Sequence, residues 1–79
     1  MEVEIITPET AVFSANNIIL IQLPGTDGSF EILQNHAPII ASLKKGKIKI
    51  IDHAKTTQFI EINGGVVEVL ANKVLILAE

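Results

Sequence analysis

Along most of this chain, apolar and polar residues alternate with a period of two. The alternation is clear in residues 2–5, 47–50, 60–62 and 67–69, where Val or Ile follows Glu or Lys. No stretch shows the 3.6-residue spacing of an amphipathic helix. The last run, residues 74–77, is apolar on both faces. This pattern predicts short strands that each bury one face against a common core.

Turn-forming residues separate these runs. With 79 residues the chain is expected to form one domain, residues 1–79. The spacing of the turns predicts about eight to ten short, mostly antiparallel strands in an all-β sandwich or flattened barrel. Asn-Gly is the strongest of these signals, because both residues tolerate positive φ. The predicted turns are Thr7-Pro8, Ala15-Asn16-Asn17, residues 24–28, residues 35–38, Lys44-Lys45-Gly46, residues 52–55, Asn63-Gly64-Gly65 and Asn72-Lys73.

Composition excludes several classes of function. The net charge is −3, arginine is absent, and the only aromatic residues are three phenylalanines, which argues against nucleic-acid binding. No apolar run approaches the ~20 residues that a membrane-spanning helix needs, and no signal peptide is evident. We therefore expect a soluble or peripheral protein. The absence of cysteine is consistent with a reducing compartment.

One segment, residues 23–39, departs from simple alternation. It combines Pro24-Gly25, an Asp27-Gly28 turn, a short apolar strand and the sequence Asn35-His36-Ala37-Pro38. Its glycines lack the spacing of a phosphate-binding loop, and no helix is expected after them, so a tight turn is the favoured interpretation. Gly64-Gly65 likewise indicates a turn, a bulge or a close backbone approach.

His36 is the histidine in the most distinctive context. It could act as a general base or a ligand, but no carboxylate or second histidine lies near it in sequence. We favour a structural or interface role in which its ring bonds to the backbone of the turn. The chain offers no catalytic triad and no metal-ligand cluster, so we expect no catalysis, metal or cofactor. The enzyme alternative is a small hydrolase or isomerase that uses His36 and Glu31.

Two lysine-containing segments suggest other roles. Lys44, Lys45, Lys47 and Lys49 form a basic cluster, which indicates a solvated strand face or a basic docking patch. Lys55 lies at a predicted hairpin tip, as does the modified lysine of biotinyl or lipoyl carrier domains. The flanking residues do not match the attachment motif of those domains. A small β-sandwich adapter or carrier domain is therefore the alternative to the function considered next.

The whole chain resembles the N-terminal β-sandwich domain of the ε subunit of F-type ATP synthase, which corresponds to the mitochondrial δ subunit. Short matches occur in the same order and spacing throughout the chain. They are residues 4–9, Val12-Phe13-Ser14, Pro24-Gly25, Gly28-Ser29-Phe30, Asn35-His36-Ala37-Pro38, Leu43, Gly46, Ile48, Ile50, Gly64-Gly65, Glu68-Val69, Asn72 and residues 74–79.

The resemblance implies a non-catalytic rotor subunit in the central stalk of a proton-translocating synthase. Such a subunit joins the γ subunit to the polar loops of the membrane c-ring and transmits torque, while catalysis occurs in the head of the complex. It implies a protein that is peripheral to the membrane, on the cytoplasmic side of the bacterial inner (plasma) membrane or the organelle equivalent. We expect the isolated subunit to be a monomer whose γ-facing side exposes apolar side chains.

The resemblance also implies which residues contact each partner. The residues implied at the c-ring are Thr26, Asp27, Gly28, Ser29 and Glu31. The residues implied at γ are Thr7, His36, Ile39 and Ser42.

The sequence departs from the family pattern in two ways. Glu31 and Gln34 stand where the family usually has glycine and proline, so Glu31 must adopt an ordinary β conformation or be strained. The family's C-terminal helical hairpin, which inhibits ATP hydrolysis in many bacteria, has no counterpart in these 79 residues. We therefore expect coupling and assembly without that inhibition.

Overall fold

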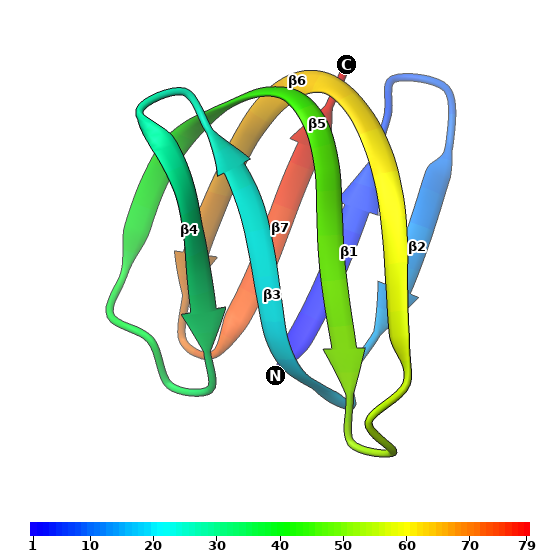
Figure 1. Cartoon of the computed structure of the whole chain (residues 1–79), viewed down its shortest axis with the longest axis vertical. Coiled ribbons are helices and arrows are strands. Elements are labelled where there is room, and N and C mark those ends of the chain that lie inside the picture. The colour runs from blue at the N-terminus through cyan, green and yellow to red at the C-terminus, as the bar shows by residue number, and fades with distance from the viewer.

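The computed structural model describes residues 1–79, which form seven strands and no helix (Figure 1). Hydrogen bonds join the strands into one sheet in the order β2-β1-β7-β6-β5-β3-β4. Neighbours are antiparallel except β1 and β7, which run parallel. The predicted all-β class is confirmed. The strands are β1 (Glu2–Ile6), β2 (Ala11–Ala15), β3 (Ile18–Gly25), β4 (Gly28–Leu33), β5 (Ile39–Asp52), β6 (Thr57–Leu70) and β7 (Lys73–Ala78).

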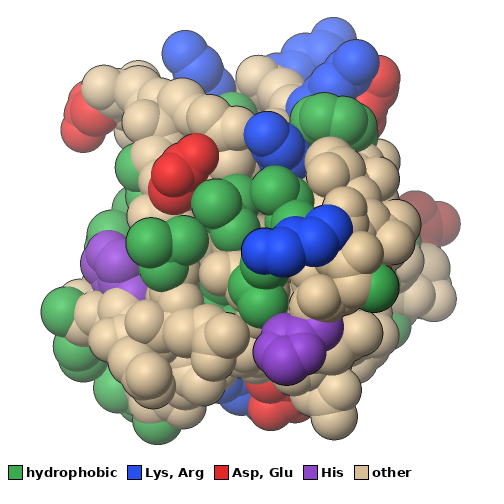
Figure 2. All heavy atoms as spheres, turned by 60° about the horizontal axis from the view of Figure 1, so that its bottom comes forward, with side chains coloured by type: hydrophobic (Ala, Val, Ile, Leu, Met, Phe, Trp, Pro, Cys, Tyr) green, Lys and Arg blue, Asp and Glu red, His purple; other side chains and the backbone are tan.

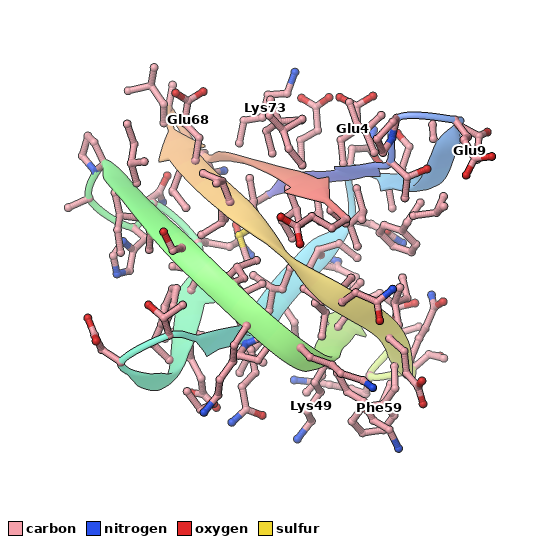
Figure 3. All side chains as sticks on the ribbon, turned by 90° about the horizontal axis from the view of Figure 1, so that it is seen from above. Glu4, Glu9, Lys49, Phe59, Glu68 and Lys73 are labelled. Atoms are coloured by element: carbon pink, nitrogen blue, oxygen red, sulfur yellow. The ribbon has the colours of Figure 1, made fainter.

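The sheet folds over on itself into two layers (Figure 1, Figure 3). The first layer contains β2, β1 and β7, together with residues 66–70 of β6 and residues 39–43 of β5. The second layer contains β3 and β4, together with residues 46–52 of β5 and residues 57–62 of β6. Strands β5 and β6 have 14 residues each and belong to both layers.

The core between the layers follows from the alternation. In β1, Val3 and Ile5 are buried, whereas Glu2 is exposed and Glu4 is half-buried. The same period of two operates in the other strands and yields a single cluster of 16 buried hydrophobic residues. No polar or charged residue is buried. The core residues are Met1, Val3, Ile5, Ile18, Ile21, Leu23, Ile32, Leu43, Ile48, Ile50, Ile62, Val67, Val69, Val74, Ile76 and Ala78.

Two predicted turns are wrong, and they explain why there are fewer strands than expected. Lys44-Lys45-Gly46 lies inside β5, and Asn63-Gly64-Gly65 lies inside β6. The two segments pair with each other, with Lys44 opposite Gly64. Each long strand therefore continues through a point where the sequence suggests a break.

At this point the two strands change which side faces the core. In β6 the buried residues are Ile62 and Gly64, then Val67 and Val69, so the alternation shifts by one residue. Gly64 and Gly65 permit the shift, since their φ values of +139° and +149° are accessible essentially only to glycine. The glycines mark the passage from one layer to the other. The alternative interpretation of a close backbone approach is supported, because a Cβ on Gly65 would lie 3.0 Å from the Cα of Ala78.

The remaining hairpins are tight. Thr26 and Asp27 form the two-residue loop between β3 and β4, as the sequence predicts. The loop between β6 and β7 consists of Ala71 and Asn72, with φ values of 52° and 61°. The predicted turn at Asn72-Lys73 is therefore displaced by one residue, and Lys73 is the first residue of β7.

Candidate functional site

The turn between β3 and β4 carries three residues of the predicted c-ring set: Thr26, Asp27 and Gly28. All three are exposed. The amide of Thr26 donates a hydrogen bond to the carbonyl oxygen of Ser42 at 3.0 Å, which ties the turn to β5. The turn is thus held at a fixed place at one end of the sandwich.

The other two residues of that set, Ser29 and Glu31, point to a different surface. They alternate in β4 with the inward-facing Phe30 and Ile32, so they lie on the outer face of the second layer. The side chain of Gln22 donates to Ser29 Oγ at 3.1 Å. Glu31 pairs with Gln22 in the sheet and has no positive φ, so it adopts the ordinary β conformation rather than a strained one.

A hollow of about 380 Å³ lies beside the turn. It brings together residues predicted for two different partners: the turn residues for the c-ring, and Ile39 and Ser42 for γ. Ser42 is exposed, whereas Ile39 is partly buried against the core. Part of the predicted γ set, Ile39 and Ser42, therefore adjoins the predicted c-ring turn at this end of the molecule. The hollow is lined by Gly25, Thr26, Asp27, Gly28, Phe30, Ile39, Ile40, Ala41 and Ser42.

His36 lies in the connection between β4 and β5 and is exposed. Its Nδ1 donates to the carbonyl oxygen of Ala37 at 2.7 Å, as the structural interpretation expects. The same loop is anchored by the amide of Asn35, which donates to Asn72 Oδ1 at 2.7 Å. Asn35 has a φ of 61°, a conformation that asparagine tolerates. No hydrogen bond or ion pair links His36 to Glu31, so the pairing that the enzyme alternative requires is not seen.

The outer face of the first layer exposes large apolar side chains. Ile40 is 73% exposed, Leu70 is 58% exposed and Leu77 is 53% exposed. Smaller exposed fractions belong to other aliphatic residues that alternate with the core positions of β1, β2, β6 and β7. We call this surface the first-layer face. Its apolar residues are Ile6, Val12, Ile40, Val66, Leu70, Leu75 and Leu77.

The first-layer face also contains part of the predicted γ set. Ser42 pairs with Val66, Val66 with Leu77, and Leu77 with Ile6, so these residues form one row across four strands. Thr7 follows Ile6 directly. The apolar residues of this face were not predicted individually. Two features of the sequence indicate outward-facing apolar side chains. Residues 74–77 are apolar on both faces, and Ile39 and Ile40 are adjacent, so that one of them must face outward in a strand.

The structure shows no group of three or more His, Cys, Asp or Glu side chains that could hold a metal ion. It also contains no helix of the length and apolarity required to cross a membrane. Lys55 is exposed in the β5–β6 loop, where its φ is 66°. Asp52 Oδ1 closes that loop by accepting hydrogen bonds from the amides of Ala54 and Thr56.

Comparison with known proteins gives one consistent family. Residues 1–79 match the family model described as the β-sandwich domain of the ATP synthase delta/epsilon chain. The chain is 37% identical over 78 residues to the ATP synthase epsilon chain of Chlorobium limicola, covering 99% of this chain and 88% of that protein. It is 40% identical over 79 residues to the epsilon chain of Campylobacter curvus, covering 100% of this chain and 60% of that protein.

Two solved structures have the same fold. A chain of the central stalk/c-ring of Tetrahymena thermophila mitochondrial ATP synthase matches with a TM-score of 0.82 and 23% identity, over 99% of this chain and 62% of that one. A chain of the Euglena gracilis mitochondrial ATP synthase OSCP/F1/c-ring structure matches with a TM-score of 0.90 and 16% identity, over 96% of this chain and 48% of that one. At these identities the structural matches bear on the fold alone.

Proposed function

Because the chain belongs to the family of the β-sandwich domain of ATP synthase delta and epsilon chains, we propose that it is a non-catalytic central-stalk subunit of a proton-translocating F-type ATP synthase. In this role it links γ to the c-ring and rotates with them. The names of the relatives, which are ATP synthase epsilon chains, support membership in that complex. Such a subunit is peripheral to the membrane, on the cytoplasmic side in bacteria.

The observation that carries this proposal is the first-layer face. Exposure of Ile40, Leu70 and Leu77 to water on one side contributes nothing to the stability of the isolated domain. A large exposed apolar surface of this kind marks an interaction site. Burying one such side chain at an interface contributes about 1.5–3 kcal/mol. We assign this face to γ, because Thr7 and Ser42 lie at its edge.

The c-ring contact is assigned to the turn formed by Thr26, Asp27 and Gly28. The turn is exposed and polar, which suits the polar loops of a ring better than an apolar partner. It is also short and hydrogen-bonded to Ser42, so little ordering entropy is lost when it binds. Ser29 and Glu31 extend this contact onto the adjacent strand face.

Torque transmission requires a body that does not deform between the two contacts. The chain has 48 backbone–backbone hydrogen bonds, of which 40 lie within its strands. Strands β5 and β6 run without interruption from one layer to the other and pair over almost their full length. The γ-facing side and the c-ring turn are therefore connected through a single continuous sheet.

The test is direct binding of purified γ to the wild-type chain and to two variants. Ile40→Ser removes the most exposed apolar side chain of the first-layer face and is expected to weaken binding about tenfold or more. Leu33→Ser is the matched control, since Leu33 is 54% exposed on the outer face of the second layer. Equal affinity of γ for all three proteins would refute the assignment of this face, and absence of binding to the wild type would refute the proposed function.

A further inference from the structure

A second apolar surface lies on the opposite side of the molecule. Leu33, Leu20 and Ile51 form one row across β4, β3 and β5, with Leu20 paired to both of the others. Ile51 pairs with Thr57 in β6, and Phe59 lies two residues further along that strand. Phe59 is therefore a diagonal neighbour of Ile51, close enough for its aromatic ring to contact Ile51. We call these four residues the second-layer patch. Phe59 is 60% exposed, and the other two phenylalanines are partly buried against the core.

Lysines form part of the border of the second-layer patch, with Glu31 and Glu61 beside them. Five of the six lysines of the chain lie between residues 44 and 55. Lys49 pairs directly with Phe59, and the two side chains leave the sheet on the side opposite to Glu4, Glu68 and Lys73 (Figure 3). Figure 2 shows hydrophobic side chains gathered together, with lysine side chains and an acidic side chain around them. The patch thus combines apolar area with positive charge.

We propose that the second-layer patch docks the apolar side of an acidic amphipathic helix from another protein. This contact lies on the layer opposite to the proposed γ face and adjoins the proposed c-ring contact at Glu31. Four strands at a spacing of about 4.8 Å make the patch about 14 Å wide. A helix rises 1.5 Å per residue, so about ten residues, or three turns, span that width and bring apolar side chains over each strand.

Charge favours a discrete acidic segment over an anionic membrane surface. Glu61 pairs with Lys47, and Glu31 is separated from Lys49 only by Gln22, so two carboxylates border the same patch. A uniformly anionic surface would meet these carboxylates as well as the lysines. A helix can place its own carboxylates opposite Lys49 and Lys55 and leave the positions opposite Glu31 and Glu61 uncharged.

The probe is a synthetic helical peptide with Leu at every third or fourth residue and Glu at the flanking positions. A control peptide has Lys in place of each Glu. Binding to the 79-residue chain is followed by NMR chemical-shift changes and calorimetry at low and physiological salt. The proposal predicts that only the acidic peptide binds, that it shifts the amides of β3, β4 and the second-layer parts of β5 and β6, and that salt weakens it.

Variants separate the apolar and the charged contributions. Phe59→Ala and Lys49→Glu are each expected to weaken binding of the acidic peptide about tenfold, and Glu31→Gln is expected to strengthen it. Lys73→Glu is the matched control on the opposite layer and should leave the affinity unchanged. Circular dichroism of each variant checks that the fold is retained.

Several results would overturn the proposal. These are equal binding of the two peptides, shifts confined to the first-layer face, no effect of Phe59→Ala, or no binding of the acidic peptide. Binding to phosphatidylglycerol vesicles with no binding of the acidic peptide would identify a membrane surface instead. The γ-binding assay is independent of this outcome, because Phe59→Ala should leave γ affinity unchanged.

Discussion

The passage of β5 and β6 between the layers depends on glycine, and replacing Gly65 with alanine tests this directly. The φ of Gly65 is +149°, so a side chain there is strained even in open space. In addition, the new Cβ would collide with the carbonyl oxygen of Leu77 and lie 3.0 Å from the Cα of Ala78. Both contacts are with backbone, which cannot rotate away.

The cost can be estimated from these two effects. An unfavourable backbone conformation costs about 1–3 kcal/mol, and inserting a methyl group into a packed site costs about 1–3 kcal/mol. Together Gly65→Ala should lower the free energy of unfolding by about 2–6 kcal/mol. A chain of 79 residues has a total stability of about 4–12 kcal/mol. The substitution should therefore remove a large part of the stability of the domain.

Substitutions of two other glycines measure backbone strain and steric crowding separately. Gly28 has a φ of +131°, but a Cβ there would meet nothing within 4 Å, so Gly28→Ala measures backbone strain alone. Gly46 has no positive φ, but its Cβ would lie 2.9 Å from Cβ of Pro24, so Gly46→Ala measures crowding alone. The loss for Gly65→Ala should exceed the loss for either of these substitutions alone.

The assay is urea unfolding followed by far-ultraviolet circular dichroism, since the chain has no tryptophan or tyrosine for fluorescence. The midpoint and slope together give the change in the free energy of unfolding. If Gly65→Ala proves no more destabilising than Gly28→Ala, the close approach of Leu77 and Ala78 does not constrain this position. If both are as stable as the wild type, the backbone argument itself is wrong.

Three other substitutions test local features by the same unfolding assay. Ala71→Asn should raise the free energy of unfolding by about 0.5–1 kcal/mol, because asparagine tolerates the positive φ of this turn better than alanine does; no gain would contradict the turn conformation. Asn72→Ala should lower it by about 1.5–3 kcal/mol through loss of the hydrogen bond from Asn35 and added strain, and an unchanged midpoint would show that this bond does not anchor the loop. Glu31→Gly should lower it by about 0.5–1 kcal/mol, since Glu31 lies in an ordinary strand; a gain would instead indicate that Glu31 is strained.

The sequence predicts the local structure well where one strand buries one face. Val3 and Ile5 in β1 follow the alternation, and the Thr26-Asp27 hairpin lies where its glycines indicate. Prediction from the sequence fails where a glycine is required by packing between strands that are distant along the chain. Asn63-Gly64-Gly65 has the residues of a turn, but its φ values of +139° and +149° are not those of a turn, and only the pairing with β5 shows that the chain bends and continues.

In the candidate site, too, some features can be predicted from the sequence and others cannot. Residues 23–39 stand out in the sequence, and the structure confirms that they contain a tight turn and an anchored loop. The first-layer face is not apparent from local spacing, because residues such as Val66 and Leu77 become outward-facing only after the sheet closes. The basic cluster from Lys44 to Lys49 is recognisable, but its continuity within β5 and the pairing of Lys49 with Phe59 are not.

A stalk subunit of an ATP synthase should remain bound to the rest of the complex during purification. The experiment is to purify the tagged chain with its partners from detergent-solubilised membranes of the source cell and to identify the proteins by mass spectrometry. We expect to recover γ, the α and β subunits of the head, and the c-ring. Recovery of none of them, under conditions in which the synthase stays intact, would contradict the proposed function.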